Sequence, residues 1–261
     1  MPSTIQEQLS LLARLTKREL GSRFSAGGGG WVWVIIQPLL LLAVYSVVFG
    51  VIFRARAPEA LDIPFVAWLA IALWPWLGFS DAILRASESM PQHAALISKV
   101  PMKREFLAIS SATASFALQI AGYAVVLCVL PWMGVTLTPP GLFSALLGLI
   151  ALLILANGLG VFAAALRVFF PNLQHLLPTL LMLWFFLTPI LYAPEYLPEN
   201  LKVLVYANPV AGLMTDLRAA LLEGQVLPGT TTLAMLLISI IVLAGALAFF
   251  RRMAPYFEDF L

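Results

Sequence analysis

The side chains that most often act as nucleophiles, general bases or metal ligands are scarce in this sequence. It contains two histidines, His93 and His175, and one cysteine, Cys128, which lies in an apolar run and cannot form an internal disulfide. No HExxH, GxSxG or phosphate-loop motif occurs. The glycine run Gly27 to Gly30 lacks a following Lys-Ser/Thr pair, so a hinge is the favoured interpretation. We therefore expect no catalytic residue, no metal site and no cofactor in this chain.

Acidic residues are missing from the middle of the apolar segments. From Phe106 to Leu166 there is no Asp, Glu, Lys or Arg at all. An ion-coupled carrier needs a buried acidic relay, and an intramembrane enzyme such as an acyltransferase needs a polar constellation. The sequence favours neither. We expect a transport pathway or a scaffold without its own energy source. Any active transport would then be powered by a subunit on another chain.

Composition places the chain in the membrane. Apolar residues make up 61% of it and charged residues 11%, and the mean hydropathy is +0.96, whereas soluble domains carry roughly 25% charged residues. The first 30 residues show no signal-peptide pattern. The expected fold is all-α: a polytopic membrane protein with residues 1–261 forming a single transmembrane domain.

Six segments are long and apolar enough to cross the membrane as helices, namely residues 31–53, 64–85, 106–133, 141–166, 173–192 and 231–250. Between the last two, Ala193 to Gly229 contains four prolines yet stays mostly apolar. Short re-entrant helices, one of them starting after Asn208-Pro209, fit this outer segment. An ordinary structured extracytoplasmic loop remains the alternative.

The N-terminal region, residues 1–30, is expected to form a cytoplasmic interface helix followed by the hinge. Between Thr4 and Leu20 one half of a helical wheel carries Ile5, Leu9, Leu12, Leu15 and Leu20, and the opposite half carries Arg14, Lys17 and Arg18. A basic amphipathic helix of this kind lies against membrane lipid. The segments on the side of the N-terminus hold eleven Lys and Arg residues against four on the other side, which predicts that both termini are cytoplasmic.

A long polar stretch runs from Asp81 to Glu105 and holds seven of the 28 Asp, Glu, Lys and Arg residues. It must lie in water, because unpaired charges in hydrocarbon are costly. Ser89 followed by Gln92 predicts a capping box, with Pro91 in the first turn. The expected element is a short water-facing helix, Met90 to Lys99. A contact for a soluble partner and a merely structured loop are equally compatible with it.

Aromatic residues gather at the end of the expected fifth span and in the following loop: Trp184, Phe185, Phe186, Tyr192 and Tyr196. Aromatic rings stack on the faces of sugars, and they also anchor helices at the bilayer interface. From the residues alone, the interfacial belt is the simpler interpretation.

At the level of motifs and their order, nearly the whole chain resembles the membrane subunit of ATP-binding-cassette exporters that move O-antigen, teichoic acid and capsule chains. The matching residues are Gly30-Trp31-Val32-Trp33, Gln37-Pro38, Leu73-Trp74-Pro75-Trp76, Phe79-Ser80-Asp81-Ala82, Leu96-Ile97-Ser98-Lys99-Val100-Pro101, Arg104-Glu105, Phe186-Leu187-Thr188-Pro189-Ile190, Leu197-Pro198, Asn208-Pro209 and Phe250-Arg251-Arg252. The chain departs from the family where Pro171-Asn172 replaces an Arg-Asp pair before the fifth span. It also has Gly28-Gly29 where the family has bulkier residues.

The resemblance implies a homodimer in the inner membrane with two copies of an ATPase subunit, which would carry ATP and Mg. It makes Met90 to Lys99 a coupling helix and Ala193 to Gly229 an outer gate. The implied substrate is a polyprenyl-diphosphate-linked glycan, with no role for nucleic acid. The ATPase-coupling residues would be Ser89, Pro91, His93, Leu96, Ile97 and Lys99, and the substrate path would include Trp184, Phe185, Tyr192 and Tyr196. An exporter of a drug or lipid, or a non-transporting membrane scaffold, remains the alternative.

Overall fold

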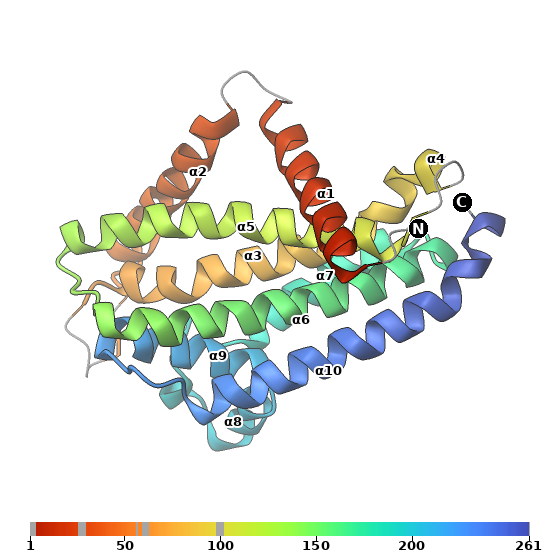
Figure 1. Cartoon of the computed structure of the whole chain (residues 1–261). Coiled ribbons are helices and arrows are strands. Elements are labelled where there is room, and N and C mark those ends of the chain that lie inside the picture. Colours follow the sequence, from red (N-terminus) through yellow and green to blue (C-terminus); the bar gives the residue numbers. More distant parts are fainter. Residues whose placement is uncertain (1–3, 26–29, 56, 59–62, 98–101, 261) are drawn as a thin grey trace.

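The computed structural model describes residues 4–25, 30–55, 57–58, 63–97 and 102–260. Helices dominate this part of the chain, and none of the described residues lies in a strand. The prediction of an all-α membrane protein is therefore confirmed (Figure 1). In chain order the α-helices are α1 (Ile5–Ser25), α2 (Gly30–Tyr45), α3 (Phe65–Gln92), α4 (Ala94–Ile97), α5 (Glu105–Val129), α6 (Leu142–Phe169), α7 (Leu173–Leu187), α8 (Glu199–Tyr206), α9 (Pro209–Arg218) and α10 (Thr230–Met253).

Shorter helical segments extend several of these elements. π-Helical turns follow α2 and α9, at Ser46–Ile52 and Ala219–Glu223. Short 3₁₀ segments are Leu130–Met133, Pro139–Gly141, Pro194–Tyr196 and Ala254–Asp259.

Five helical stretches within the described residues are long and apolar enough to cross a membrane: Val32–Ile52, Phe65–Gln92, Glu105–Met133, Pro139–Phe169 and Thr230–Phe257. They correspond to five of the six expected spans. The remaining one, predicted over residues 173–192, is helical only as α7 and ends at Leu187. Its 15 residues extend about 22 Å, less than the roughly 30 Å hydrocarbon core. The helix ends there because Thr188 precedes Pro189 and takes an extended conformation (φ −98°, ψ 133°).

Helix α3 is the centre of the bundle and packs against α5, α6, α7 and α9. In its most apolar window 83% of the residues are buried. Pro75 lies inside this helix and has no N–H to donate to the carbonyl of Ile71, four residues earlier. The Tyr123 hydroxyl on α5 donates to that carbonyl instead, at 2.9 Å. The proline is therefore tolerated because a neighbouring helix satisfies the backbone group that it frees.

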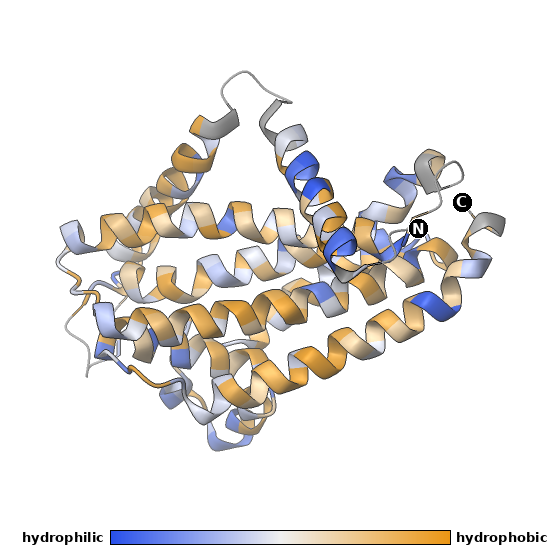
Figure 2. Cartoon of the chain, in the orientation of Figure 1, coloured by the Kyte–Doolittle hydropathy of each residue, from blue (hydrophilic) through white to orange (hydrophobic). Residues whose placement is uncertain are grey.

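Helices α2 and α10 lie on the outside of the bundle. Only 11% of the apolar window of α2 and its π-helical extension is buried, and 22% of the window of α10. Figure 2 shows hydrophobic residues along both helices. Surfaces of this kind meet lipid or a second protein in a membrane.

Helix α1 confirms the predicted N-terminal helix and runs further, to Ser25. Its start is capped reciprocally: Glu7 donates its N–H to the Thr4 hydroxyl at 3.2 Å, and Thr4 donates its own N–H to the Glu7 carboxylate at 3.3 Å. The polar and apolar residues that Figure 2 shows on α1 match the amphipathic pattern. The position of α1 at the membrane interface stays a prediction.

The proline-rich outer segment forms the short helices α8 and α9, as expected. Helix α9 packs against α3, α6 and α10, and Asn208 caps its start by accepting a hydrogen bond from the N–H of Val210 at 3.1 Å. A close backbone approach locks the end of this segment to the start of α6. A Cβ atom on Gly141 would lie 1.6 Å from the Ala220 carbonyl oxygen, so only glycine fits there.

Candidate functional site

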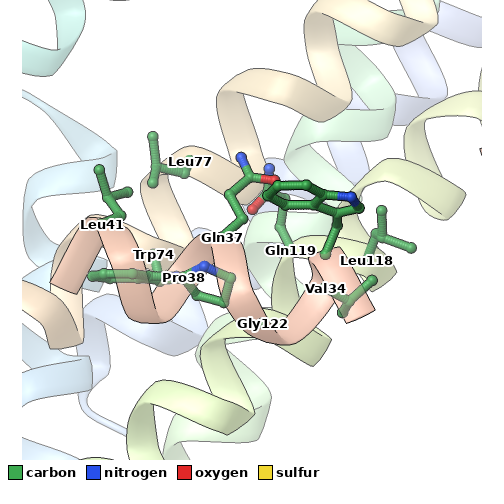
Figure 3. A pocket seen from close by; sticks show the side chains of 10 residues that line it. Val34, Gln37, Pro38, Leu41, Trp74, Leu77, Leu118, Gln119 and Gly122 are labelled. Atoms are coloured by element: carbon green, nitrogen blue, oxygen red, sulfur yellow. The ribbon is translucent and has the colours of Figure 1, made fainter. Parts of the chain in front are cut away.

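A pocket of about 400 Å³ lies between α2, α3 and α5, inside the region expected to span the membrane. Figure 3 shows its labelled side chains, with the Gln37 and Gln119 carboxamides directed into the same space. Its lining residues are Trp33, Val34, Gln37, Pro38, Leu41, Trp74, Leu77, Leu118, Gln119 and Gly122.

The polar groups of this pocket are unsatisfied by the chain itself. Neither Gln37 nor Gln119 has a hydrogen-bond partner among the residues that the structure describes. A third polar group is the carbonyl of Val34, because Pro38 has no N–H to donate to it. An unpaired amide in an apolar medium costs roughly 2–7 kcal/mol. These groups therefore require water, a solute or a second protein in the pocket.

The pocket depends on a close approach of α2 to α5. A Cβ atom on Gly122 would lie 3.3 Å from Cγ of Pro38 and 3.6 Å from the Val34 carbonyl oxygen. Any larger residue at position 122 would enter the space beside the freed carbonyl. The glycine thus keeps α2 close and the polar groups accessible.

The aromatic residues predicted for a substrate path are divided by the structure. Trp184 lies against Trp76 and Phe79 on α3, with ring centroids 6.0 Å and 5.4 Å away, and its indole N–H donates to the Asn208 side chain at 2.9 Å. Phe185 also packs against Trp76, at 5.9 Å. Both are half-buried, so these rings join α7 to α3.

The two tyrosines lie beyond α7. The Tyr192 hydroxyl donates to the carbonyl of Phe186 at 3.0 Å, whereas Tyr196 is 65% exposed. Among the four predicted path residues, Tyr196 alone lines a described pocket. That pocket measures about 700 Å³ and includes Trp68 and Arg218.

Arg218 is a buried cation that sequence inspection had counted only as an outer charge. Its Nε donates to the Trp68 carbonyl at 3.2 Å. Its Nη1 and Nη2 donate to the carbonyls of Pro189 and Ile190 at 2.7 Å and 3.0 Å. Burial lowers the pKa of the guanidinium to about 9, which leaves it charged at neutral pH. Arg218 therefore holds α9 against α3 and the turn after α7.

The predicted helix from Met90 to Lys99 is wrong in its bounds. Helix α3 continues to Gln92, His93 ends it, and α4 is a separate four-residue helix. The predicted capping box is also wrong. The Ser89 hydroxyl donates to the carbonyl of Ala86 at 2.6 Å, and the Gln92 side chain donates to Glu88 at 3.2 Å.

The predicted coupling residues therefore lie in different structural elements. Ser89 is buried and Pro91 lies in the last turn of α3, where the burial of Ser89 and Met90 outweighs the helix-breaking tendency of the proline. Leu96 lies in α4, as does Ile97. Lys99 lies outside the described residues.

Charged residues join α3 to its neighbours near its last turns. Asp81 and Arg85, four residues apart on α3, form an ion pair at 3.4 Å, and Asp81 also accepts a hydrogen bond from Ser115 on α5. Glu88 lies 3.9 Å from Arg167 at the end of α6. Arg167 in turn donates to Gln174 on α7 at 2.9 Å. This network fixes the relative positions of four helices at one end of the bundle.

Sequence inspection missed the pocket glutamines and the role of Arg218. It searched the spans for acidic residues, whereas the polar groups are neutral carboxamides at Gln37 and Gln119. A search for any polar side chain within an uncharged span would have found both. Arg218 gave no local signal, because the carbonyls that it binds belong to distant segments.

The comparisons with known proteins agree with this architecture. The sequence profile of the family described as ABC-2 type transporter matches residues 10–222. The chain is 27% identical over 257 residues to the O-antigen export system permease protein RfbA of Myxococcus xanthus, covering 95% of this chain and 94% of that protein. It is 24% identical to the protein of that name from Klebsiella pneumoniae, with 96% and 95% covered. It is 25% identical to the polysialic acid transport protein KpsM of Escherichia coli, with 95% of each chain covered. Since the profile spans most of its length, the chain belongs to the ABC-2 type transporter family of membrane proteins.

Proposed function

We propose that this protein is the transmembrane subunit of an ATP-driven exporter that moves a polyprenyl-diphosphate-linked polysaccharide across the cytoplasmic membrane. The names of its relatives, an O-antigen export system permease protein and a polysialic acid transport protein, support a glycan as the substrate. The observation that carries the proposal is the pocket in which Gln37 and Gln119 have no hydrogen-bond partner among the described residues.

The chemistry of this pocket suits sugars better than ions or apolar solutes. A carboxamide both donates and accepts hydrogen bonds, as a sugar hydroxyl does. Trp33, 58% exposed, offers an aromatic face for stacking against a sugar ring. The pocket lining contains no charged side chain that would favour an ion. An apolar drug or a lipid tail would leave both carboxamides unpaired, at the cost described above.

The proposed working unit is a homodimer with two copies of an ATPase subunit, which carry ATP and Mg. The largely exposed surface of α2 is the face for a second copy, and the polar pocket then opens toward the path between the two copies. By the positive-inside bias both termini and the segment after α3 are cytoplasmic. The ATPase would contact this segment, around Ser89 to Lys99. The four aromatic residues at and after the end of α7 are proposed to border the outer part of the path.

The test uses Gln37→Leu and Gln119→Leu in the full chain, co-expressed with the ATPase encoded beside it. Each variant should assemble with the ATPase at the wild-type level yet export several-fold less glycan, measured as glycan at the cell surface. Gln225→Leu is the matched control, because Gln225 lies exposed in the outer loop, outside the pocket. Normal glycan export by both pocket variants would refute the proposal. Unchanged or improved export of apolar dyes, with no glycan transported, would favour a drug or lipid exporter.

A further inference from the structure

A second polar pocket, of about 260 Å³, lies where α5 begins and α10 ends. Figure 1 shows this end of the bundle, where the start of α1 and the end of α10 also lie. The charged residues that line it are Lys103, Arg104, Glu105 and Arg251. Three cations thus share the lining with one carboxylate.

Each charged side chain is held in place by the fold. Glu105 has a side chain only 7% exposed, and Arg251 neutralises it with Nε at 3.0 Å from the carboxylate. Arg104 donates to the backbone carbonyl of Ala254 at 2.6 Å, and Lys103 donates to the side chain of Gln8 on α1 at 2.7 Å. The hydrogen-bond partner of Lys103 is the neutral side chain of Gln8, so the charge of its ammonium group persists in the pocket.

The pocket lies at the depth of lipid headgroups. Glu105 is the first residue of an apolar span, and the chain carries no charge for the next 61 positions, from Phe106 to Leu166. Arg251 lies near the end of the α10 span. The amphipathic helix α1 packs against α5 beside the pocket. Clustered cations at the edge of a hydrocarbon region attract the phosphates of anionic lipids.

We propose that this pocket binds the phosphate group of an anionic phospholipid headgroup. A phosphate accepts hydrogen bonds from a guanidinium fork and attracts a lysine ammonium as a point charge. Arg251 supplies the guanidinium, and 59% of its side chain is exposed. Lys103 supplies the ammonium from the side of the pocket that faces α1. Lipid bound here joins α1, α5 and α10 through one phosphate. This inference does not depend on what the protein exports.

The test measures phosphatidylglycerol binding to the purified full chain, held in phosphatidylcholine nanodiscs at constant ionic strength. Lys103→Gln should weaken binding about fivefold, the change that corresponds to about 1 kcal/mol for one basic residue near an anionic surface. Arg252→Gln is the matched control, because it makes the same charge change at an exposed neighbour outside the pocket lining. It should bind phosphatidylglycerol within twofold of the wild type. Lys103→Arg should restore binding, which a loss of folding in the Gln variant would not predict.

Three outcomes would overturn the proposal. Equal weakening by Lys103→Gln and Arg252→Gln would mean that only the overall charge matters. Competition by inorganic phosphate at concentrations similar to those of the lipid would mean a site for free phosphate rather than for a headgroup. Loss of ATPase co-purification in Lys103→Gln with lipid binding unchanged would identify the pocket as a protein contact.

Discussion

The Arg218 guanidinium lies 3.5 Å from the centroid of the Trp68 ring, so a helix of the outer segment is fixed to the central helix of the bundle. The stacking is reinforced by the Nε hydrogen bond to the Trp68 carbonyl. A cation over an aromatic face is worth about 2 kcal/mol or more when desolvated. The cation–π contact and the hydrogen bond thus both join Arg218 to Trp68.

Arg218→Ala should therefore destabilise the protein strongly. It leaves the carbonyls of Trp68, Pro189 and Ile190 without this donor, and each buried unsatisfied group costs about 1–3 kcal/mol. Arg218→Lys should lie between the wild type and Ala, because one ammonium cannot reproduce the planar fork. Thermal unfolding in detergent measures the effect, with Lys202→Ala as the control, because Lys202 is half-buried on α8 and its partner Glu199 is exposed. Equal unfolding temperatures for Arg218→Ala and Lys202→Ala would contradict this account.

Tyr123→Phe tests the compensation for the proline in α3. Removing the hydroxyl leaves the Ile71 carbonyl unpaired, at a cost of about 1–3 kcal/mol. Pro75→Ala restores the N–H that can bond to this carbonyl within the helix. The combined variant should therefore lose less stability than the sum of the two single variants. Strictly additive changes in a double-mutant cycle of unfolding would show that the two sites are not coupled.

Tyr192 and Tyr196 should respond differently to the loss of a hydroxyl. The Tyr192 hydroxyl is bonded to the Phe186 carbonyl, so Tyr192→Phe should lower stability by about 0.5–1.5 kcal/mol. Tyr196 is exposed and lines the 700 Å³ pocket. Tyr196→Ala should reduce glycan export while stability stays near the wild-type value, and Tyr196→Phe should have a smaller effect because it retains the ring. Normal export per inserted molecule in Tyr196→Ala would favour the interfacial-belt interpretation.

Leu96→Asp tests the segment after α3 as an ATPase contact. A carboxylate there would enter the proposed contact without a partner, so the variant should insert normally and lose most of the co-purifying ATPase. Asn172→Asp is the control, since it adds the same charge at an exposed position between α6 and α7. Full assembly and export with Leu96→Asp would rule out this contact.

Local patterns predicted much of the architecture. Apolar length predicted five of the six expected spans correctly, and the Asn208-Pro209 pair indicated the start of α9. The end of α3 was missed because burial of Ser89 and Met90 holds the helix beyond the point where its local sequence suggests a boundary. In such a case, packing against neighbouring side chains outweighs the low helix propensity of the local sequence.

The candidate site was less predictable because its parts come from different helices. Gln37 belongs to α2 and Gln119 to α5, and no spacing rule connects them. The division of the aromatic cluster also depends on distant contacts, above all the hydrogen bond from Trp184 to Asn208. Such contacts are decided by packing and not by periodicity.

The unequal burial of α2 and α3 has a consequence for motion. Most of the α3 window is enclosed by other helices, whereas 11% of the α2 window is. Elements with few buried contacts shift at a small cost in free energy, while well-enclosed ones move only when the whole fold is disrupted. Displacement of α2 therefore exposes little new apolar surface inside the chain. In an exporter of the proposed kind, outward tilting of α2 would make room for a bulky polymer while the enclosed helices stay in place.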